Sequence, residues 1–147
     1  MRFEELKAWR KVAESDLFSI GIEIKAMVDL PMVLFLEGNL GAGKTTFAGY
    51  FIDDREVVSP TYKLISEIGL FLHADFYRLN DAQELYFLGI EDYLADKKYF
   101  LVEWGIKHFS TLNQILPEEF NYYKLDISQE QLSDFRNIIL SKIHADF

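Results

Sequence analysis

The chain has 147 residues, of which 50% are hydrophobic and none is cysteine. That length predicts a single domain, residues 1–147, with one hydrophobic core, and the lack of cysteine excludes disulfides, cysteine–zinc sites and thiol nucleophiles. Twenty-four acids against 15 bases give a formal net charge of −9, which disfavours stable nucleic-acid binding by this chain alone, because neutralising phosphates requires clustered cations.

The N-terminal third is predicted to contain a helix, a buried strand and a second helix. Before them, Phe3–Val12 fits a strand and a helix equally well. Ser15 or Asp16 can cap a helix that ends near residue 27. The apolar run Met32–Leu36 is typical of a strand buried on both faces of a parallel sheet, and Lys44–Asp53 is predicted to be helical. One face of the first helix would carry Leu17, Ile20, Ile24 and Met27.

Strands and short helices are predicted to alternate through the rest of the chain. Tyr62–Ile68 and Leu70–Phe76, joined at Gly69, predict a hairpin. Phe135–Ile143 combines helical spacing with β-branched residues, so its type stays open. The order predicts an α/β fold, a parallel core sheet with antiparallel strands added and helices on its flanks. The other predicted elements are a helix Asp81–Leu88 capped by Asn80 or Asp81 and ended by Gly89, a helix Ile90–Leu94, and strands Tyr99–Val102 and Tyr122–Ile127.

Residues 38–45 form a complete G-x-x-x-x-G-K-T phosphate-binding loop directly behind the first predicted strand. The glycines allow successive backbone N–H groups to converge on a phosphate, and the following helix directs its positive end at the same anion. Lys44 adds a point charge for the β- and γ-phosphates, and the Thr45 hydroxyl can ligate Mg²⁺. We therefore predict a P-loop NTPase fold that binds ATP through Gly38, Asn39, Leu40, Gly41, Ala42, Gly43, Lys44, Thr45 and Thr46.

A second candidate is the acid that ends a buried strand, Glu103 after Tyr99–Val102. P-loop enzymes place such a carboxylate opposite the loop hydroxyl to hold Mg²⁺. Strands also end in charged surface residues for no functional reason, so the pattern is weak by itself. Given the phosphate-binding loop upstream, we predict that Glu103 and Thr45 bind the metal together.

A third candidate is the segment His73-Ala74-Asp75-Phe76-Tyr77-Arg78. Strand alternation places His73, Asp75 and Tyr77 on one face. Asp75, at the end of this strand, is predicted to orient or deprotonate the attacking water. Arg78 can meet a phosphate or a partner's carboxylate. The alternatives are a salt-bridged surface strand and a purely structural His73.

A fourth candidate is Thr61 in the sequence Ser59-Pro60-Thr61. Proline forces the preceding residue into an extended conformation, which leaves the Thr61 hydroxyl available. Such a threonine can sense a γ-phosphate in P-loop switches. A simple turn into the next strand is the alternative.

Taken together, these motifs closely resemble the TsaE family, the small P-loop ATPases of bacterial tRNA threonylcarbamoyladenosine biosynthesis. The resemblance rests on collinear blocks at 38–46, 59–62, 73–78, 84–90 and 102–104. It implies that Thr45 and Glu103 ligate Mg²⁺, that Asp75 serves catalysis and that Trp104 shapes the nucleotide site. It also implies that the C-terminal segment is mostly strand and that Arg136 contacts the nucleotide. Two departures are Asn39 in place of the usual aspartate and Leu17 where the family commonly places a threonine near the adenine.

The resemblance implies an accessory Mg²⁺-dependent ATPase that binds a threonylcarbamoyl-transferase subunit and its dimerising partner, and resets that pair between turnovers. The five arginines are not clustered, so no arginine finger is evident and hydrolysis by the chain alone is predicted to be slow. A small-molecule kinase and a nucleotide-binding scaffold without hydrolysis are the alternatives. A signal-peptide pattern and an apolar run of membrane-spanning length are both lacking, so we expect a cytoplasmic protein without membrane contact.

Overall fold

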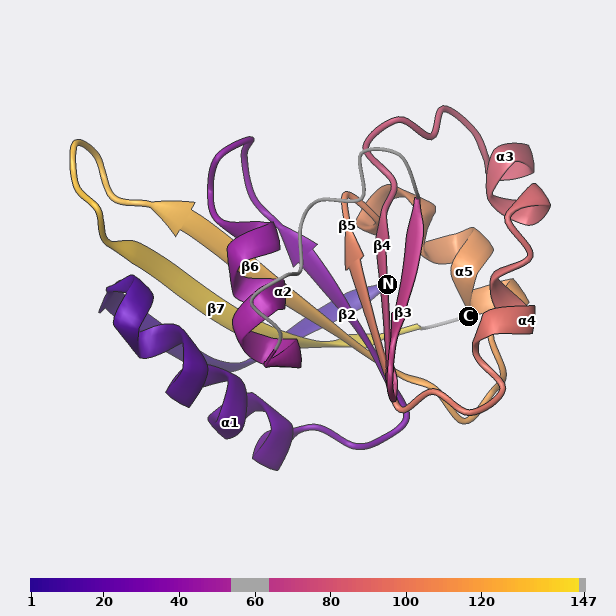
Figure 1. Ribbon diagram of the computed structural model, residues 1–147, viewed down its shortest axis with the longest axis horizontal. Helices are drawn as coiled ribbons and strands as arrows, with labels where there is room; N and C mark the ends of the chain where they lie inside the picture. Colours follow the sequence, from indigo (N-terminus) through magenta and orange to yellow (C-terminus); the bar gives the residue numbers. More distant parts are fainter. Residues whose placement is uncertain (54–63, 146–147) are drawn as a thin grey trace.

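The computed structural model describes residues 1–53 and 64–145, so Thr61 and the predicted start of a strand at Tyr62 lie outside the described residues. The fold is built on one seven-stranded mixed sheet in the order β1-β7-β6-β2-β5-β4-β3 (Figure 1). The strands are β1 Arg2–Val12, β2 Met32–Glu37, β3 Ile65–Ile68, β4 Phe71–Asp75, β5 Tyr99–Glu103, β6 Asn121–Gln129 and β7 Arg136–His144. The helices are α1 Leu17–Met27, α2 Lys44–Ile52, α3 Ala82–Phe87, α4 Ile90–Tyr93 and α5 Phe109–Ile115, with 3₁₀ turns at Glu14–Asp16 and Ile106–His108.

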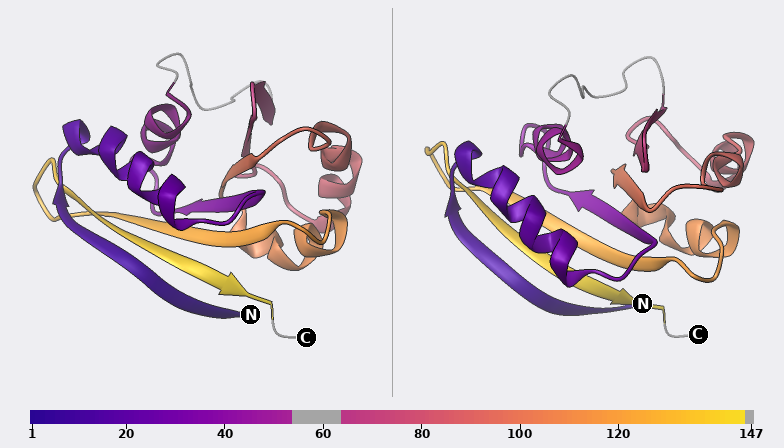
Figure 2. Two further views of the ribbon diagram at one scale, coloured as in Figure 1. Left: turned by 90° about the horizontal axis from the view of Figure 1, so that it is seen from below. Right: turned by 60° about the horizontal axis from the view of Figure 1, so that its bottom comes forward.

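The centre of the sheet is parallel and its edges are antiparallel, as the sequence predicted. Strands β6, β2, β5 and β4 run in the same direction. The hairpin β3–β4 adds one edge, and β7 and β1 extend the other. Figure 2 shows β1 and β7 side by side along that second edge.

Helices cover both faces of the sheet, which explains why β2 is apolar at every position but its last. Leu34 and Leu36 pack on the side of α1 and α2, whereas Val33 and Phe35 pack on the side of α3, α4 and α5 (Figure 2). Side chains along a strand alternate between faces, so a strand covered on both sides must be hydrophobic throughout. Because the parallel strands are buried and paired in register, their carboxyl ends lie together at one end of the sheet, where the candidate site is found.

The structure decides the segments that the sequence left open. Residues 2–12 form strand β1, and the C-terminal segment forms strand β7, as the family resemblance implied. Asp81 caps α3 by accepting a hydrogen bond from the Glu84 N–H at 3.0 Å. Asp16 precedes α1 without a side-chain cap, because its carboxylate accepts the Ala13 N–H at 2.8 Å instead.

Two details of the sequence reading need correction. Met27 was expected on the buried face of α1, but it is 37% exposed, because it is the last residue of the helix. Helix α5 was not predicted at all, although Phe109, Leu112 and Leu116 recur at helical spacing and are buried. In the part of the chain that is described, no helix is long and apolar enough to cross a membrane.

Candidate functional site

The phosphate-binding loop connects β2 to α2 at the edge of the sheet where the parallel strands end (Figure 1). Gly43 precedes the helix with a φ of 106°, a left-handed conformation that favours glycine. A Cβ at Gly38 would overlap the Ile127 carbonyl oxygen of β6, so only glycine lets the loop approach the sheet this closely. The first amides of a helix lack acceptors within the helix, so the start of α2 offers N–H donors to an anion.

Lys44, the first residue of α2, is buried with its charge directed at the loop. It is 5% exposed, and its Nζ donates to the carbonyl oxygens of Gly38 at 2.7 Å and Asn39 at 3.0 Å. The same Nζ lies 4.0 Å from the centre of the Trp104 ring. Burial lowers the pKa of Lys44, and the charges of Glu103, Glu37 and Asp75 oppose that effect without reversing it. The Lys44 ammonium is therefore held in place by two backbone carbonyl groups and the Trp104 ring.

Thr45 and Glu103, which were predicted to bind a metal together, are in direct contact. The Thr45 hydroxyl donates to the Glu103 carboxylate, with Oγ1 2.8 Å from Oε1 and 3.0 Å from Oε2. A hydroxyl that donates its proton in this way keeps its lone pairs for a cation. Hydroxyl and carboxylate oxygens are hard ligands that suit Mg²⁺, which keeps several waters and needs few protein ligands. The donor set fits magnesium.

His73 contacts the Glu103 carboxylate from the interior of the protein. The ring is 1% exposed, and its Nε2 lies 2.7 Å from Glu103 Oε2. His73 was predicted only as part of a motif, without a link to Glu103. The strand register is the missing signal, because β4 lies parallel to β5 with His73 opposite Leu101 and Asp75 opposite Glu103.

Asp75, the last residue of β4, lies beside Glu103 at the end of the sheet. Its Oδ1 accepts the Tyr77 N–H at 3.0 Å, which fixes the chain as it leaves the strand. The predicted alternation of β4 is confirmed, because Leu72 and Ala74 pack in the core on the opposite face. The position suits a base that acts on a water molecule in the adjoining cleft.

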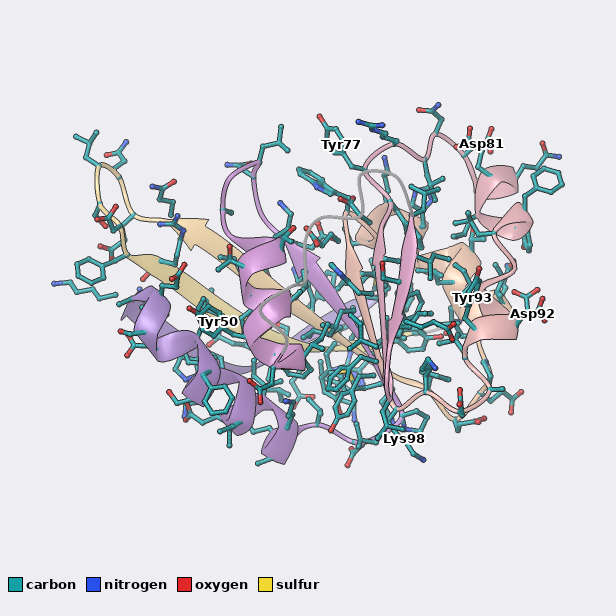
Figure 3. The ribbon with its side chains drawn as sticks, in the orientation of Figure 1. Tyr50, Tyr77, Asp81, Asp92, Tyr93 and Lys98 are labelled. Carbon is teal, nitrogen blue, oxygen red and sulfur yellow. The ribbon has the colours of Figure 1, made fainter. Side chains whose placement is uncertain are left out.

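These residues surround a cleft of about 370 Å³. Figure 3 shows Tyr77 at this end of the molecule, projecting near the loop between β2 and α2. The cleft brings together most of the predicted site residues with three others, Leu64, Tyr77 and Arg78. Its lining is Leu40, Gly41, Gly43, Lys44, Thr45, Thr46, Leu64, Asp75, Tyr77, Arg78, Glu103 and Trp104.

Arg136, predicted to contact the nucleotide, lies at a second cleft of about 370 Å³ on the other side of the loop. Its Nε donates to the Ala42 carbonyl oxygen at 2.8 Å. Ala42, Gly43 and Thr46 also line this cleft, and so does Leu17 of α1. The start of α2 therefore separates two clefts, and Gly43 and Thr46 border both. Charged residues line each of them, Glu14, Asp134 and Arg136 in the second cleft.

Trp104 follows Glu103 in a conformation that its neighbours impose. Its φ is 58°, in the left-handed region that costs a non-glycine residue about 1–2 kcal/mol. The next residue is Gly105, where a Cβ would overlap Val102, and the Ile106 N–H then donates to Glu37 Oε1 at 2.9 Å. Glu37 was not predicted as a site residue, although an acid that ends an apolar strand beside the loop is a visible signal in the sequence.

Within residues 1–53 and 64–145, no group of three or more histidines and acids is arranged to hold a metal ion by itself. A metal at Thr45 and Glu103 would thus need oxygen ligands from water or from a bound phosphate. This matches Mg²⁺ bound together with a nucleotide rather than a separate structural ion.

Comparison with known proteins supports the motif-based resemblance. The sequence profile of the family "Threonylcarbamoyl adenosine biosynthesis protein TsaE" matches residues 12–138. The chain is 34% identical over 146 residues to the tRNA threonylcarbamoyladenosine biosynthesis protein TsaE of Haemophilus influenzae, covering 94% of this chain and 83% of that protein. It is 35% identical over 119 residues to the Bacillus subtilis protein of the same name, covering 76% and 72%. The crystal structure of Bacillus subtilis YdiB has a TM-score of 0.65 and 26% identity, covering 98% and 89% of the chains. The resemblance and the predicted P-loop NTPase fold are confirmed.

Proposed function

The chain belongs to the TsaE family and acts in tRNA threonylcarbamoyladenosine biosynthesis, and we propose that it does so as a Mg²⁺-dependent ATP hydrolase. The contact between Thr45 and Glu103 carries this proposal, because it joins the phosphate-binding loop to the acid of β5. Beside this pair, the Lys44 ammonium donates to two backbone carbonyl oxygens and lies over the Trp104 ring. An anion with a divalent cation suits this arrangement.

Each group has a defined part in the proposed reaction. The loop amides and Lys44 hold the β- and γ-phosphates, and Thr45 and Glu103 hold Mg²⁺, which when bound neutralises charge on those phosphates. Asp75 orients the attacking water and accepts its proton. Arg78 is the one arginine among the described residues that line the cleft, and it is exposed. We therefore expect slow hydrolysis by the chain alone.

The second cleft suits the nucleoside part of ATP. It begins at Gly43 and Thr46, where the phosphate cleft ends, and its apolar wall includes Val12, Leu17 and Ile138. Glu14, Asp134 and Arg136 add charged groups to this wall, and apolar walls with a few polar groups are typical of sites for small organic ligands. Arg136 closes it by its hydrogen bond to the Ala42 carbonyl oxygen.

The proposed partners are the threonylcarbamoyl-transferase subunit and its dimerising partner, which ATP hydrolysis would reset between turnovers. The net charge of −9 supports docking on proteins rather than on tRNA. Thr61, proposed to report the γ-phosphate to the docking surface, lies outside the described residues.

Two substitutions test the proposed chemistry. Glu103→Ala should reduce Mg²⁺-dependent phosphate release about 100-fold while ATP affinity measured in EDTA stays near that of the wild type.

Asp75→Ala should leave ATP affinity with Mg²⁺ intact and reduce hydrolysis by about 10²–10⁴-fold. Calorimetry measures binding, and phosphate release with the transferase pair present measures turnover.

The matched control is Asp126→Ala, which removes a carboxylate from β6, separated from β5 by β2 and outside both clefts. It should change neither binding nor turnover. Equal loss of binding and turnover in Glu103→Ala would show that the metal role is misassigned. Transfer of phosphate to a small acceptor, with no release of inorganic phosphate, would favour a kinase instead.

A further inference from the structure

His73 is the most deeply buried titratable side chain beside the proposed site, and the proposed mechanism does not use it. Its ring is 1% exposed in the middle of β4, and its Nε2 is 2.7 Å from Glu103 Oε2. We propose that His73 is a positioning residue that fixes the Glu103 carboxylate for Mg²⁺. This inference rests on the function proposed above and adds to it a residue that does not touch the metal or the nucleotide.

The hydrogen bond has one chemically sensible direction. Glu103 is 2% exposed, and an ionised carboxylate accepts hydrogen bonds but cannot donate them. His73 Nε2 therefore carries the proton and donates it to Oε2. A buried carboxylate without donors is strongly destabilised, so each donor to Glu103 is worth more than one at the surface.

The two donors to Glu103 differ in how firmly they are held. Thr45 is the second residue of α2, directly after a loop that must bind and release a nucleotide. His73 belongs to β4, which pairs with β5 on one side and with β3 on the other. In that frame His73 lies opposite Leu101 and Ser66, so its backbone is fixed by two neighbours. His73 thus holds Glu103 in place whatever Thr45 contacts.

Partners of this kind have measurable effects in metal sites. Groups that hydrogen-bond a metal-binding carboxylate restrict its rotation, and removing them commonly lowers metal affinity by about 10–100-fold. Glu103 is the one carboxylate of the proposed metal pair, so its orientation decides how well the pair binds. We expect the loss of the His73 N–H to weaken Mg²⁺ binding by about that factor.

The chain contains a second histidine–carboxylate pair that serves as an internal control. His144 Nε2 lies 2.8 Å from Glu4 Oε1, nearly the same distance as in the buried pair. The side chains of His144 and Glu4 are 28% and 53% exposed, and they join β7 to β1 at the far edge of the sheet. Water can replace that donor, so its loss should have no effect on the metal.

Two substitutions separate the hydrogen bond from the volume of the ring. His73→Phe keeps a ring of similar size without an N–H donor, whereas His73→Gln keeps an N–H donor without the ring. Mn²⁺ binding in the presence of ADP, followed by electron paramagnetic resonance, reports the metal directly. ADP affinity in EDTA, measured by calorimetry, reports the nucleotide site without the metal. His144→Phe is the matched control, and thermal melting confirms that each variant folds.

The expected result is a 10–100-fold loss of Mn²⁺ affinity in His73→Phe, with ADP affinity in EDTA unchanged, and recovery to within about threefold of the wild type in His73→Gln. Wild-type Mn²⁺ affinity in His73→Phe would overturn the inference while leaving the proposed ATPase intact, and so would an equal loss in His73→Gln. If His73→Phe does not fold, His73→Leu replaces it in the same comparison. A wild-type protein that binds no metal with ADP would overturn both the proposed function and this inference.

Discussion

A buried lysine lies at each end of the sheet, and the two lysines differ in the groups that pair with their charge. Lys44 lies at the end where the parallel strands finish, and Lys97 lies at the other end, before β5 begins. Figure 3 labels Tyr77 near the first end and Lys98, the neighbour of Lys97, at the second. The lysines are 5% and 9% exposed, so burial alone does not distinguish them.

Their partners do distinguish them. Lys97 forms ion pairs with Glu67 at 3.2 Å and Asp96 at 3.3 Å, and although burial opposes them, these acids raise its pKa overall. Lys44 bonds to two carbonyl oxygens, and burial lowers its pKa. A buried charge paired with acids is satisfied within the protein, whereas one held by dipoles still gains from an incoming anion. The contrast favours Lys44 over Lys97 as the lysine that would bind an anionic ligand, without reference to any motif.

The largest expected effect comes from removing each of the two charges in turn. Lys44→Met should reduce ATP hydrolysis by 100-fold or more, by the usual order of magnitude for losing a charge that stabilises the reacting phosphates, while the melting temperature stays the same or rises. Lys97→Met should leave hydrolysis unchanged and cost about 1 kcal/mol or less, because its acidic partners are largely exposed and can be solvated.

Phosphate release, calorimetry with ATP and thermal melting measure these effects in both variants. A Lys97→Met protein with impaired ATP binding would show that the two charges are coupled through the sheet. A Lys44→Met protein that melts at a much lower temperature would show that the Lys44 charge is required for folding rather than kept for an anion.

A smaller effect tests the ring that holds Lys44. Trp104 lies 4.0 Å from the Lys44 ammonium, and a cation–π contact is worth about 1 kcal/mol, or about fivefold in affinity. Trp104→Leu should therefore weaken ATP binding about fivefold in calorimetry. In Trp9→Phe, which leaves Trp104 as the sole tryptophan of the chain, ATP should change the emission as the phosphate draws Lys44 away from the ring.

Lys44→Met in the Trp9→Phe background supplies the control, since it removes the cation and should abolish most of that change. Unaltered emission in Trp9→Phe, alongside normal binding by calorimetry, would mean that Lys44 keeps its place over the ring when ATP binds. The comparison would then rest on the ion pairs alone.

The sequence predicted the parts of the site whose residues are neighbours in the chain. The conformation of residues 38–46 follows from local sequence, because glycines and a following helix suffice to build a phosphate-binding loop. Glu103 was predicted because a buried strand that ends in an acid is a local pattern, and the phosphate-binding loop upstream favoured a functional interpretation of it. Helix α5 was missed because it has only seven residues and follows directly on a glycine and a 3₁₀ turn.

Contacts between strands could not be predicted in the same way. The bond between His73 and Glu103 depends on the register of β4 against β5, which a single sequence does not state. The bond from Ile106 to Glu37 depends on the left-handed turn at Trp104. Tertiary packing sets both, and they place the buried Glu103 and the half-buried Glu37 beside the site.

The smallest predicted effect concerns Glu37, which influences the charge of Lys44 without contacting it. Burial raises the pKa of Glu37, and the Asp126 charge adds to this, while the Ile106 N–H and the charges of Lys44 and Lys124 oppose it. A folded-state pKa above the unfolded value means that the native protein holds this proton more tightly. Its contribution to stability is therefore present below the ordinary glutamate pKa of about 4.5 and is lost as the pH rises through the folded-state pKa.

Glu37→Gln keeps an oxygen to accept the Ile106 N–H and removes the charge. The variant and the wild type should melt at similar temperatures near pH 4, and the variant should gain by no more than about 1 kcal/mol at pH 7. Thermal melting across that range measures the difference. Since Glu37 also opposes the lowering of the Lys44 pKa, the substitution leaves that lysine with two influencing acids instead of three. A variant less stable than the wild type at pH 7 would show that the Glu37 charge is compensated, as that of Lys97 is, and that this end of the sheet tolerates buried charge by pairing it.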